Sequence, residues 1–412
     1  MTADATAHGA PALLDPAQEP PLDRYCDVVM KGGVTDGVVY PWAVMELARH
    51  YRFQSIGGTS VGAVAAALTA ASEYSRRYGS VKGFNEVLRE VPLALAEQPD
   101  GVNTKLFSLF HPSPGGERLF RLFVGMFNKQ ACWARTRAII KQVLADYVLG
   151  PHLSRNLDYG IFLLLLVVTG LLGWLCLVQP STVLPMALLL LTNLALLAAV
   201  VLLILGLRLF DDVRRQLGAP GYGLCTGMSP VGGPDGFTDW LHKGIQAASG
   251  RALDQPLTFR DLWDAPGGPA LTGERNGLIE RPKSIDLQMI STNLTHGRPS
   301  ALPLNDNSDA LYFREGDLRP YFPDSVLKHL CRCCPVLATY QHLGLRRLPQ
   351  GELPVLVAAR LSLSFPVLFK AVPLWVVPGA RAPYRCWFSD GGICANFPIH
   401  LFDAVLPRWP RC

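Results

Sequence analysis

The sequence predicts an α/β fold, with helices packed on a central, mostly parallel sheet that is interrupted by a pair of apolar helices. A short apolar segment, a glycine-containing turn and a helical pattern follow one another twice between residues 26 and 76. This alternation is typical of parallel sheets. Two uncharged apolar runs, at residues 160–178 and 183–207, are long enough to cross a membrane.

The first two strand–turn–helix units lie near the N-terminus. Residues 26–30 and 53–56 are short apolar runs that predict buried strands, and residues 38–49 and 61–76 have helical spacing. Residues 1–22 are rich in Ala and Pro, and we expect them to be disordered.

The remaining elements follow on both sides of the apolar runs. Residues 80–147 are expected to be mostly helical around a loop at 111–116, and the Gly/Pro-rich residues 217–236 to be loop. The last part of the chain predicts a helix start at 258–263, a strand at 284–292, a helix at 353–363 and a strand at 385–389.

Composition excludes several classes of protein. Of the 412 residues, 49% are apolar and 17% charged, and the net charge is +5. That balance lacks the concentrated basic charge of a nucleic-acid-binding protein. The N-terminus has no apolar core of a secretory signal, so we expect the ten cysteines to be reduced in a cytoplasmic domain.

The two apolar runs predict a transmembrane helical hairpin over residues 156–212, with residues 160–207 in the bilayer. At about 1.5 Å per residue the runs span roughly 28 and 37 Å, against a hydrocarbon core of about 30 Å. Positive charge lies only outside the runs, at Arg155, Arg208, Arg214 and Arg215. The positive-inside rule then places both flanking segments in the cytoplasm. The alternative is a buried helical hairpin inside a large soluble core.

The hairpin divides the chain into segments. We expect a disordered segment over residues 1–22, a first part of the catalytic domain over 23–155, the hairpin over 156–212, and a second part of the domain over 213–412. The sequence does not indicate an oligomeric state.

Ser60 is the candidate nucleophile. It lies in the pentapeptide Gly58-Thr59-Ser60-Val61-Gly62, between a predicted strand and a predicted helix. A serine on such a turn exposes its hydroxyl, and the flanking glycines allow the tight turn and the close approach of helix and strand. The helix dipole favours negative charge developing at this position.

Two further turns supply the groups that a serine hydrolase needs. Gly32, Gly33 and Val34 follow the first strand, and their backbone N–H groups are candidates for an oxyanion hole. Asp390, which precedes Gly391 and Gly392 after the last strand, is the candidate general base. Either turn alone is more often a turn without a catalytic role. Their joint arrangement with Ser60 favours a catalytic role for all three.

This arrangement resembles the patatin-like phospholipases, in a bacterial type with an inserted hydrophobic hairpin. The marks of that family are a glycine-rich oxyanion turn, GxSxG and DG[GA], which match residues 32–37, 58–62 and 390–392 here. Further similar stretches cover most of residues 25–403. The resemblance implies a three-layer α/β/α domain and a Ser60–Asp390 dyad. The resemblance also implies that this dyad hydrolyses acyl esters of lipids without a histidine, a metal or another cofactor.

Two features depart from the family pattern. Val34 stands where the family has a third glycine, and Asp36 where it has Arg or Lys. We expect the oxyanion hole to be kept, because Val34 retains its N–H, but without the charge of a basic side chain. The chain also ends at Cys412, soon after Asp390, so we expect a shortened C-terminal tail.

Two other functional hypotheses remain open. In an α/β-hydrolase with a Ser–His–Asp triad, Ser60 would pair with a late histidine such as His400. We expect instead that His296 and His400 are both ordinary surface residues or neighbours of the site. Alternatively, the chain is a membrane-bound scaffold that keeps the fold and has lost turnover because of the altered oxyanion turn.

Three weaker signals favour structure over chemistry. Residues 329–334 (HLCRCC) hold metal-type ligands but lack a separate partner pair at a familiar zinc spacing. Residues 221–227 are glycine-rich but lack the Lys-Ser/Thr ending of a phosphate loop. Arg135, Arg137 and Lys141 fit either contact with anionic head groups or a solvated helix face.

Overall fold

The computed structural model describes residues 11–21, 24–33, 36–97, 104–127, 163, 166–171, 173–174, 178, 183–268, 283–304, 310–378 and 382–402. The chain divides into two compact units, residues 1–111 together with 225–412, and residues 112–224. The first unit contains the sheet and Ser60, and the predicted hairpin lies within the second.

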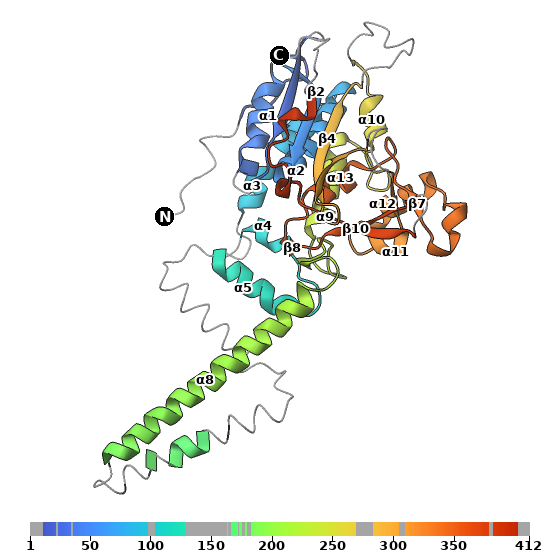
Figure 1. Cartoon of the computed structure of the whole chain (residues 1–412). Coiled ribbons are helices and arrows are strands. Elements are labelled where there is room, and N and C mark those ends of the chain that lie inside the picture. The colour runs from blue at the N-terminus through green and yellow to red at the C-terminus, as the bar shows by residue number, and fades with distance from the viewer. Residues whose placement is uncertain are drawn as a thin grey trace. The chain divides into compact units, whose positions relative to one another are not determined.

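An eight-stranded sheet forms the centre of the first unit (Figure 1). In spatial order its strands are β1 (Tyr25–Met30), β2 (Arg52–Thr59), β4 (Asp286–Asn293), β10 (Tyr384–Ser389), β9 (Val372–Val376), β6 (Leu311–Phe313) and β7 (Arg346–Arg347), and β5 (Arg298–Leu302) pairs with β4. Outside this sheet lie the short strands β3 (Gly223–Cys225) and β8 (Val367–Phe369).

The sheet is parallel where it carries Ser60 and antiparallel beyond that point. β1 pairs with β2 and β2 with β4 in parallel. The pairs β4–β5, β4–β10, β10–β9, β9–β6 and β6–β7 are antiparallel. The predicted α/β class with a central sheet is confirmed. The antiparallel extension was not predicted, because strands as short as β6 and β7 leave almost no periodic signal.

The strands that precede Ser60 and Asp390 end at the same place in the sheet. Thr59 of β2 pairs with Ile290 of β4, and Ser389 of β10 pairs with Thr292 of β4. The antiparallel β10 overlaps β4 only at these last residues, so the carboxyl ends of all three strands meet. Asp390 therefore reaches the carboxyl ends of β2 and β4 from a strand that runs opposite to them.

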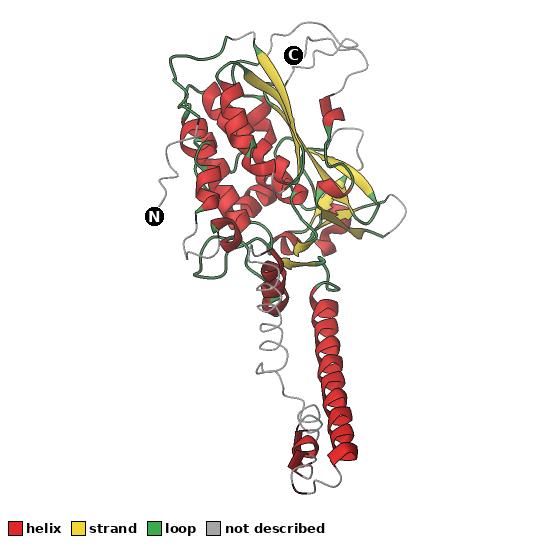
Figure 2. Ribbon diagram, turned by 90° about the vertical axis from the view of Figure 1, so that its left-hand side faces the viewer, coloured by secondary structure: helices red, strands yellow, loops and turns green. Residues whose placement is uncertain are grey.

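Helices cover the sheet, most of them on one face in the view of Figure 2. α2 (Val61–Arg77) packs on β2 and β4, and α13 (Val355–Ser362) packs on β4 and α2. Around α2 lie α1 (Tyr40–Ala48), the π-helix Gly83–Leu88 and α9 (Phe237–Ser249). The other helices of this unit are α3 (Val91–Ala96), α4 (Lys105–Ser108), α10 (Phe259–Trp263), α11 (Glu315–Leu318), α12 (Asp324–Cys333) and the 3₁₀ turns Asp36–Val38, Ala338–Leu343, Gly391–Ile393 and Ile399–Phe402.

A buried charged group fixes the C-terminal end of α2. Glu73 is fully buried and pairs with Arg76 and, at 2.6 Å, with Arg77. Arg76 also donates to the carbonyl of Ala48 in α1 (2.6 Å), and Arg77 to that of Phe53 in β2 (3.1 Å). A buried ion pair is held in one geometry by further hydrogen bonds of its members, and these carbonyls accept most of the remaining N–H groups of the two arginines. The helix that begins at Ser60 is thus locked to β2.

Most predicted boundaries agree with the structure to within two or three residues, and two expectations were wrong. Residues 1–22 were expected to be disordered, yet residues 11–21 pack on the first unit, because Leu14 is buried and Glu19 pairs with Arg52 at 2.6 Å. Residues 217–236 were expected to be loop throughout, yet they contain β3. Three residues between glycines are too few for a recognisable alternation. Residues 1–10, which are part of the predicted disordered segment, lie outside the described residues.

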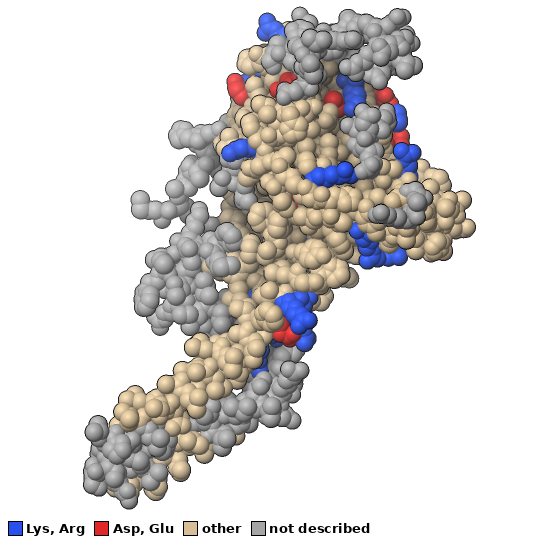
Figure 3. Space-filling view, in the orientation of Figure 1, with Lys and Arg blue, Asp and Glu red and all other residues tan. Residues whose placement is uncertain are grey.

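The second unit contains α5 (Glu117–Phe127) and the long α8 (Val183–Gln216). Residues 190–216 of α8 form the one helix in the described part of the chain that is long and apolar enough to cross a membrane, and that window is unburied. The described residues between 163 and 178 are helical, and their apolar side chains are exposed. In Figure 3 charged side chains on α8 appear only towards its C-terminal end.

Candidate functional site

Ser60 lies on a strained turn between β2 and α2. Its backbone has φ 56° and ψ −125°, a conformation that L-residues with a side chain rarely adopt. Such strain persists only where the surroundings enforce it, and it is common at nucleophiles on strand-to-helix turns. The residue is buried at 6% exposure. The predicted turn at Ser60 is present.

The two motif glycines allow this turn because the backbones around it almost touch. A Cβ on Gly62 would lie 2.6 Å from the carbonyl oxygen of Lys31 and closer still to that of Met30. A Cβ on Gly58 would lie 2.8 Å from the amide of Ala63. No side chain fits at either position, so both glycines are required by contact between β1, β2 and α2.

Asp390 faces the nucleophile from the end of β10. One carboxylate oxygen, Oδ1, accepts the N–H of Gly392 at 2.8 Å, and the residue is 4% exposed. Burial raises the pKa of the carboxyl above the usual aspartate value of 3.8, and hydrogen bonding from Ser60 and Gly392 lowers the pKa part of the way back. Oδ2 is buried and accepts no well-aligned hydrogen bond from the described residues. Ser60 and Asp390 are thus brought together, with one carboxylate oxygen left to take a proton.

Gly391 is required beside this aspartate for the same reason as Gly58 and Gly62. A Cβ there would lie 3.1 Å from the Thr59 side chain and much closer to the carbonyl of Ile290. Gly392 instead contributes its N–H to Asp390. The two glycines of the Asp-Gly-Gly motif therefore have different tasks.

A serine side chain of α13 and a backbone carbonyl of the turn after it hold Ser60 and Asp390 in place. The N–H of Ser60 donates to Ser362 Oγ at 3.0 Å, and Ser362 donates onward to the carbonyl of Ile290 at 2.5 Å. The N–H of Asp390 donates to the carbonyl of Ser364 at 3.0 Å. The bond from Ser60 to Ser362 joins segments 302 residues apart, and neither serine was identified from the sequence.

A buried arginine supports the same turn. Arg360 is fully buried, and burial lowers its pKa to about 10. Its guanidinium donates to Ser364 Oγ (2.6 Å) and to the carbonyls of Thr226 (2.9 Å) and Lys370 (3.2 Å), and it lies 4.5 Å from the centre of the Phe369 ring. Arg360 therefore positions the turn that holds Asp390.

The turn after β1 lies against Ser60. A Cβ on Gly32 would lie 3.0 Å from Cβ of Ser60. The N–H of Gly32, a predicted oxyanion donor, is bonded to the carbonyl of Asn396 at 2.8 Å. Gly33 has φ 150°, which favours glycine, and Val34 lies outside the described residues. This turn is therefore in place beside the nucleophile, with one of its N–H groups already engaged.

The start of α2 supplies donors that the sequence analysis did not name. Val61 and Gly62 are the first residues of α2, so their N–H groups have no acceptor within the helix. They follow Ser60 directly, where the positive end of the helix dipole also acts. The residue after a nucleophile on such a turn often contributes to an oxyanion hole.

No described histidine hydrogen-bonds to Ser60 or Asp390. His296 bonds to the Tyr384 hydroxyl at 2.9 Å and to Asn293, and His400 lies in the 3₁₀ turn Ile399–Phe402. Arg135, Arg137 and Lys141 lie outside the described residues. Within the described part of the chain, the acid–base partner in contact with Ser60 is a carboxylate.

No protein-family model matches the chain. The chain is 34% identical over 439 aligned residues to a protein named RpoH suppressor from Rhizobium meliloti (strain 1021). The alignment covers 94% of this chain and 65% of that protein, so the chain spans less than two thirds of its relative's length. The relative's name states no chemical activity.

The close approach at Gly62 predicts a specific loss of stability. Gly62→Ala should lower the free energy of unfolding by about 2 kcal/mol or more, because the new methyl group overlaps backbone carbonyls that cannot move aside. Gly244→Ala is the matched control: it also lies in a helix, and its Cβ would make only a 3.4 Å contact with Leu68. That change should raise stability by up to about 1 kcal/mol through helix propensity. Urea unfolding followed by circular dichroism measures both, and equal effects would contradict the packing argument.

Proposed function

We propose that the chain is a patatin-like acyl hydrolase that cleaves ester bonds of lipids, phospholipids included, through Ser60 and Asp390. The observation that carries the proposal is the contact between a strained, buried serine at a helix N-terminus and a buried carboxylate with a free oxygen. The three-layer α/β/α architecture of that family belongs to the proposal. Two observations support this architecture: α2 and α13 pack on one face of the sheet, and residues 401–402 pack against the sheet at Gly57 of β2.

The reaction follows from the roles of the two side chains. Ser60 Oγ attacks the ester carbonyl while its proton passes to Asp390, and the carbonyl oxygen becomes an oxyanion. Collapse of this intermediate expels the alcohol, which takes the proton from Asp390, and leaves Ser60 acylated. Asp390 then draws a proton from water, and the resulting hydroxide attacks the acyl group. The bond between Ser60 Oγ and the acyl carbon breaks, Oγ takes the proton back from Asp390, and the free acid leaves. No step requires a metal.

The raised pKa of Asp390 suits it to this task. An aspartate at its usual pKa is a weak base towards a serine hydroxyl, and burial makes the carboxylate more basic. The contact with Ser60 keeps donor and acceptor in place before substrate arrives. Asp390 Oδ1 is held by Gly392, so Oδ2 is the oxygen that accepts the proton.

Backbone N–H groups would hold the oxyanion. We assign this role to Gly33 and Val34, together with Val61 at the start of α2. Gly32 contributes only if its bond to the Asn396 carbonyl opens. One such donor is worth about 3 kcal/mol of transition-state stabilisation.

A membrane location belongs to the same proposal. The exposed leucines of α8, such as Leu188, Leu191 and Leu202, are each more than 60% exposed in a helix of 34 residues. Together with residues 160–178 they would form a hairpin through the bilayer. Arg208, Arg214 and Arg215 at the C-terminal end of α8 favour a cytoplasmic position for that end and for the catalytic unit. The hairpin would keep the active site beside its lipid substrate.

Loss of either side chain should abolish hydrolysis. Ser60→Ala should lower kcat/KM on short-chain esters and phospholipid vesicles by about a thousandfold or more, and Asp390→Asn by about a hundredfold or more. The controls are Ser72→Ala, whose buried hydroxyl makes no hydrogen bond with described residues, and the exposed Asp235→Asn. Both controls should retain wild-type rates.

Two outcomes of this assay would decide against the proposal. Equal rates in the wild type, Ser60→Ala and Asp390→Asn would place the activity elsewhere. Absence of turnover in all proteins, on every ester class tested, would favour the scaffold hypothesis. In that case, failure of a fluorophosphonate probe to label Ser60 would show that the serine is not activated.

The raised pKa of Asp390 predicts the acid limb of the pH–rate profile. Asp390 acts as a base only when deprotonated, so kcat/KM should fall as the pH drops through a midpoint above 3.8. The profile is measured on short-chain esters, with circular dichroism at each pH to establish that the fold persists. A midpoint at or below 3.8 would contradict a buried, desolvated base.

The proposed hairpin predicts firm membrane attachment. The full chain should stay with membranes through high salt and alkaline carbonate and come out only with detergent, because about 20 apolar residues per helix lie in hydrocarbon. A variant lacking residues 160–207 should be soluble and folded, since the sheet belongs to the other unit. Leu253→Arg, an exposed leucine outside α8, is the control and should leave attachment unchanged. Release by carbonate would exclude a spanning hairpin, and an insoluble, unfolded deletion variant would favour a buried hairpin.

A further inference from the structure

A cluster of three metal-type ligands lies away from Ser60, between α12 and the segment that leads into α13. His329 and Cys333 are four residues apart on α12, so they share one face of that helix. Glu352 comes from the turn before α13. The ligand atoms of all three residues lie within 4.8 Å of one another.

The separations between these atoms suit a tetrahedral zinc ion. Cys333 Sγ lies 3.6 Å from His329 Nε2, and a tetrahedral ion with ordinary zinc bond lengths requires about 3.5 Å. His329 Nε2 lies 3.9 Å from Glu352 Oε2, against a requirement of about 3.4 Å. A shift of about half an ångström in the half-exposed carboxylate of Glu352 closes the difference to His329.

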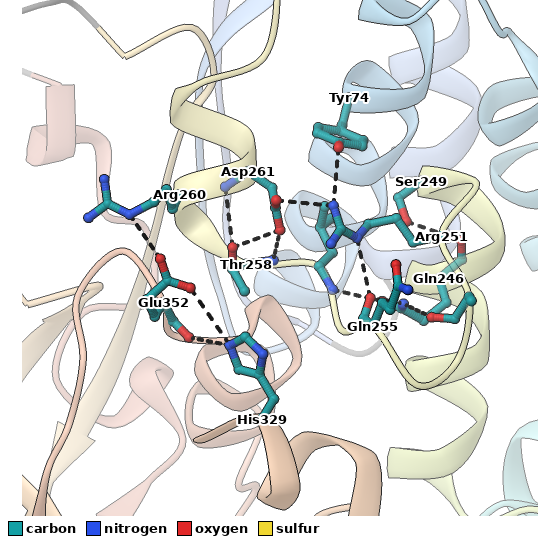
Figure 4. Close-up of polar contacts among 12 residues, drawn as sticks. Tyr74, Gln246, Ser249, Arg251, Gln255, Thr258, Arg260, Asp261, His329 and Glu352 are labelled. Atoms are coloured by element: carbon teal, nitrogen blue, oxygen red, sulfur yellow. Dashed lines mark hydrogen bonds and ion pairs between the residues drawn. The ribbon is translucent and has the colours of Figure 1, made fainter. Parts of the chain in front are cut away.

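The surroundings hold the ligands and leave the site open. Arg260 Nε binds the other carboxylate oxygen of Glu352 at 3.0 Å, which orients Oε2 towards His329 (Figure 4). His329 Nε2 donates to the Glu352 carbonyl at 3.0 Å, so the ring already faces this turn. Cys333 is exposed and Glu352 half-exposed, which gives an ion and a coordinating water access from solvent.

We propose that His329, Cys333 and Glu352 bind one zinc ion, with water as the fourth ligand. Sulfur and imidazole ligands favour zinc over magnesium and calcium, which prefer oxygen. On binding, Cys333 releases its thiol proton to solvent. The proton of His329 moves through solvent from Nε2 to Nδ1, and Nε2 exchanges its bond to the Glu352 carbonyl for a bond to the metal. The ion joins α12 to the start of α13, the helix whose Ser362 accepts the N–H of Ser60. It therefore stabilises the fold and takes no part in ester hydrolysis.

The sequence analysis judged residues 329–334 unsuited to zinc because they lack a partner pair at a familiar spacing. The structure supplies one partner, Glu352, from 19 residues beyond Cys333. The neighbouring thiols have other surroundings: Cys331 Sγ lies 3.5 Å from Glu315, and Cys334 is buried. Cys331 provides a matched control on the same helix.

Metal analysis of the purified full chain in detergent tests the proposal. After chelation, one molar equivalent of zinc and removal of free metal, the wild type should retain about one zinc per chain. Cys333→Ser, His329→Gln and Glu352→Gln should each lower zinc affinity at least about tenfold, and Cys331→Ser should not change it. Circular dichroism establishes that each variant is folded.

Two further measurements separate a built site from adventitious binding. Cobalt added to the chelated protein should give thiolate-to-cobalt charge-transfer absorption that is present in Cys331→Ser and absent in Cys333→Ser. Zinc should raise the Tm of the wild type but not of Cys333→Ser, because an ion that binds only the folded chain stabilises it. Equal zinc content in the wild type and Cys333→Ser would overturn the proposal, as would a wild type that retains no zinc under reducing conditions.

Discussion

The close contact of three backbones around Ser60 is the constraint on which the rest of the site depends. α2 starts so near β1 that a methyl group at Gly62 would overlap the carbonyls of Met30 and Lys31. Ser60 must then turn within one residue, and it does so in a conformation that few residues with side chains adopt. The strain is held by the bond from Ser60 N–H to Ser362 and, at the far end of α2, by the buried pairs of Glu73. Ser362 belongs to α13, which packs on α2, and Arg76 and Arg77 donate to carbonyls of α1 and β2, so the position of Ser60 is set by the core rather than by a loop.

Two buried charged groups of the first unit, Asp390 and Arg360, lower the stability of the fold and lie around Ser60. Burial raises the pKa of Asp390, so at neutral pH the folded state carries a carboxylate that would be better solvated in the unfolded chain. Arg360 is likewise buried, and its donors are largely satisfied by carbonyls and Ser364 rather than by a carboxylate. Such groups reduce the net stability of a fold. Their place around one serine supports the proposal that this serine is used.

The sequence alone located the parts of the site that are encoded locally. Ser60, Gly58 and Gly62 fall on one turn, and the apolar run of β2 and the alanine-rich α2 identify its two sides. Asp390 was found because it precedes two glycines after an apolar strand. Ser362, Ser364 and Asn396 were not found, because each acts through contacts with segments tens to hundreds of residues away and none has a distinctive neighbourhood. Glu352 was not found for the same reason. Metal sites are recognised in a sequence by pairs of ligands at characteristic spacings, and Glu352 comes near Cys333 only because α12 packs beside the turn before α13.

The two units differ in how much apolar surface they expose, and this difference restricts the environments in which the whole chain is stable. The first unit buries its apolar side chains in an ordinary core, whereas α8 exposes leucine after leucine over a length of about 50 Å. Burying one leucine is worth about 1.5–3 kcal/mol, so leaving such a helix in water would be strongly unfavourable. A bilayer removes that surface from water without needing a protein partner of matching shape. It also supplies the ester substrate that the Ser60–Asp390 pair is proposed to cleave. The need to remove the apolar side chains of α8 from water therefore agrees with both the location and the chemistry that we propose.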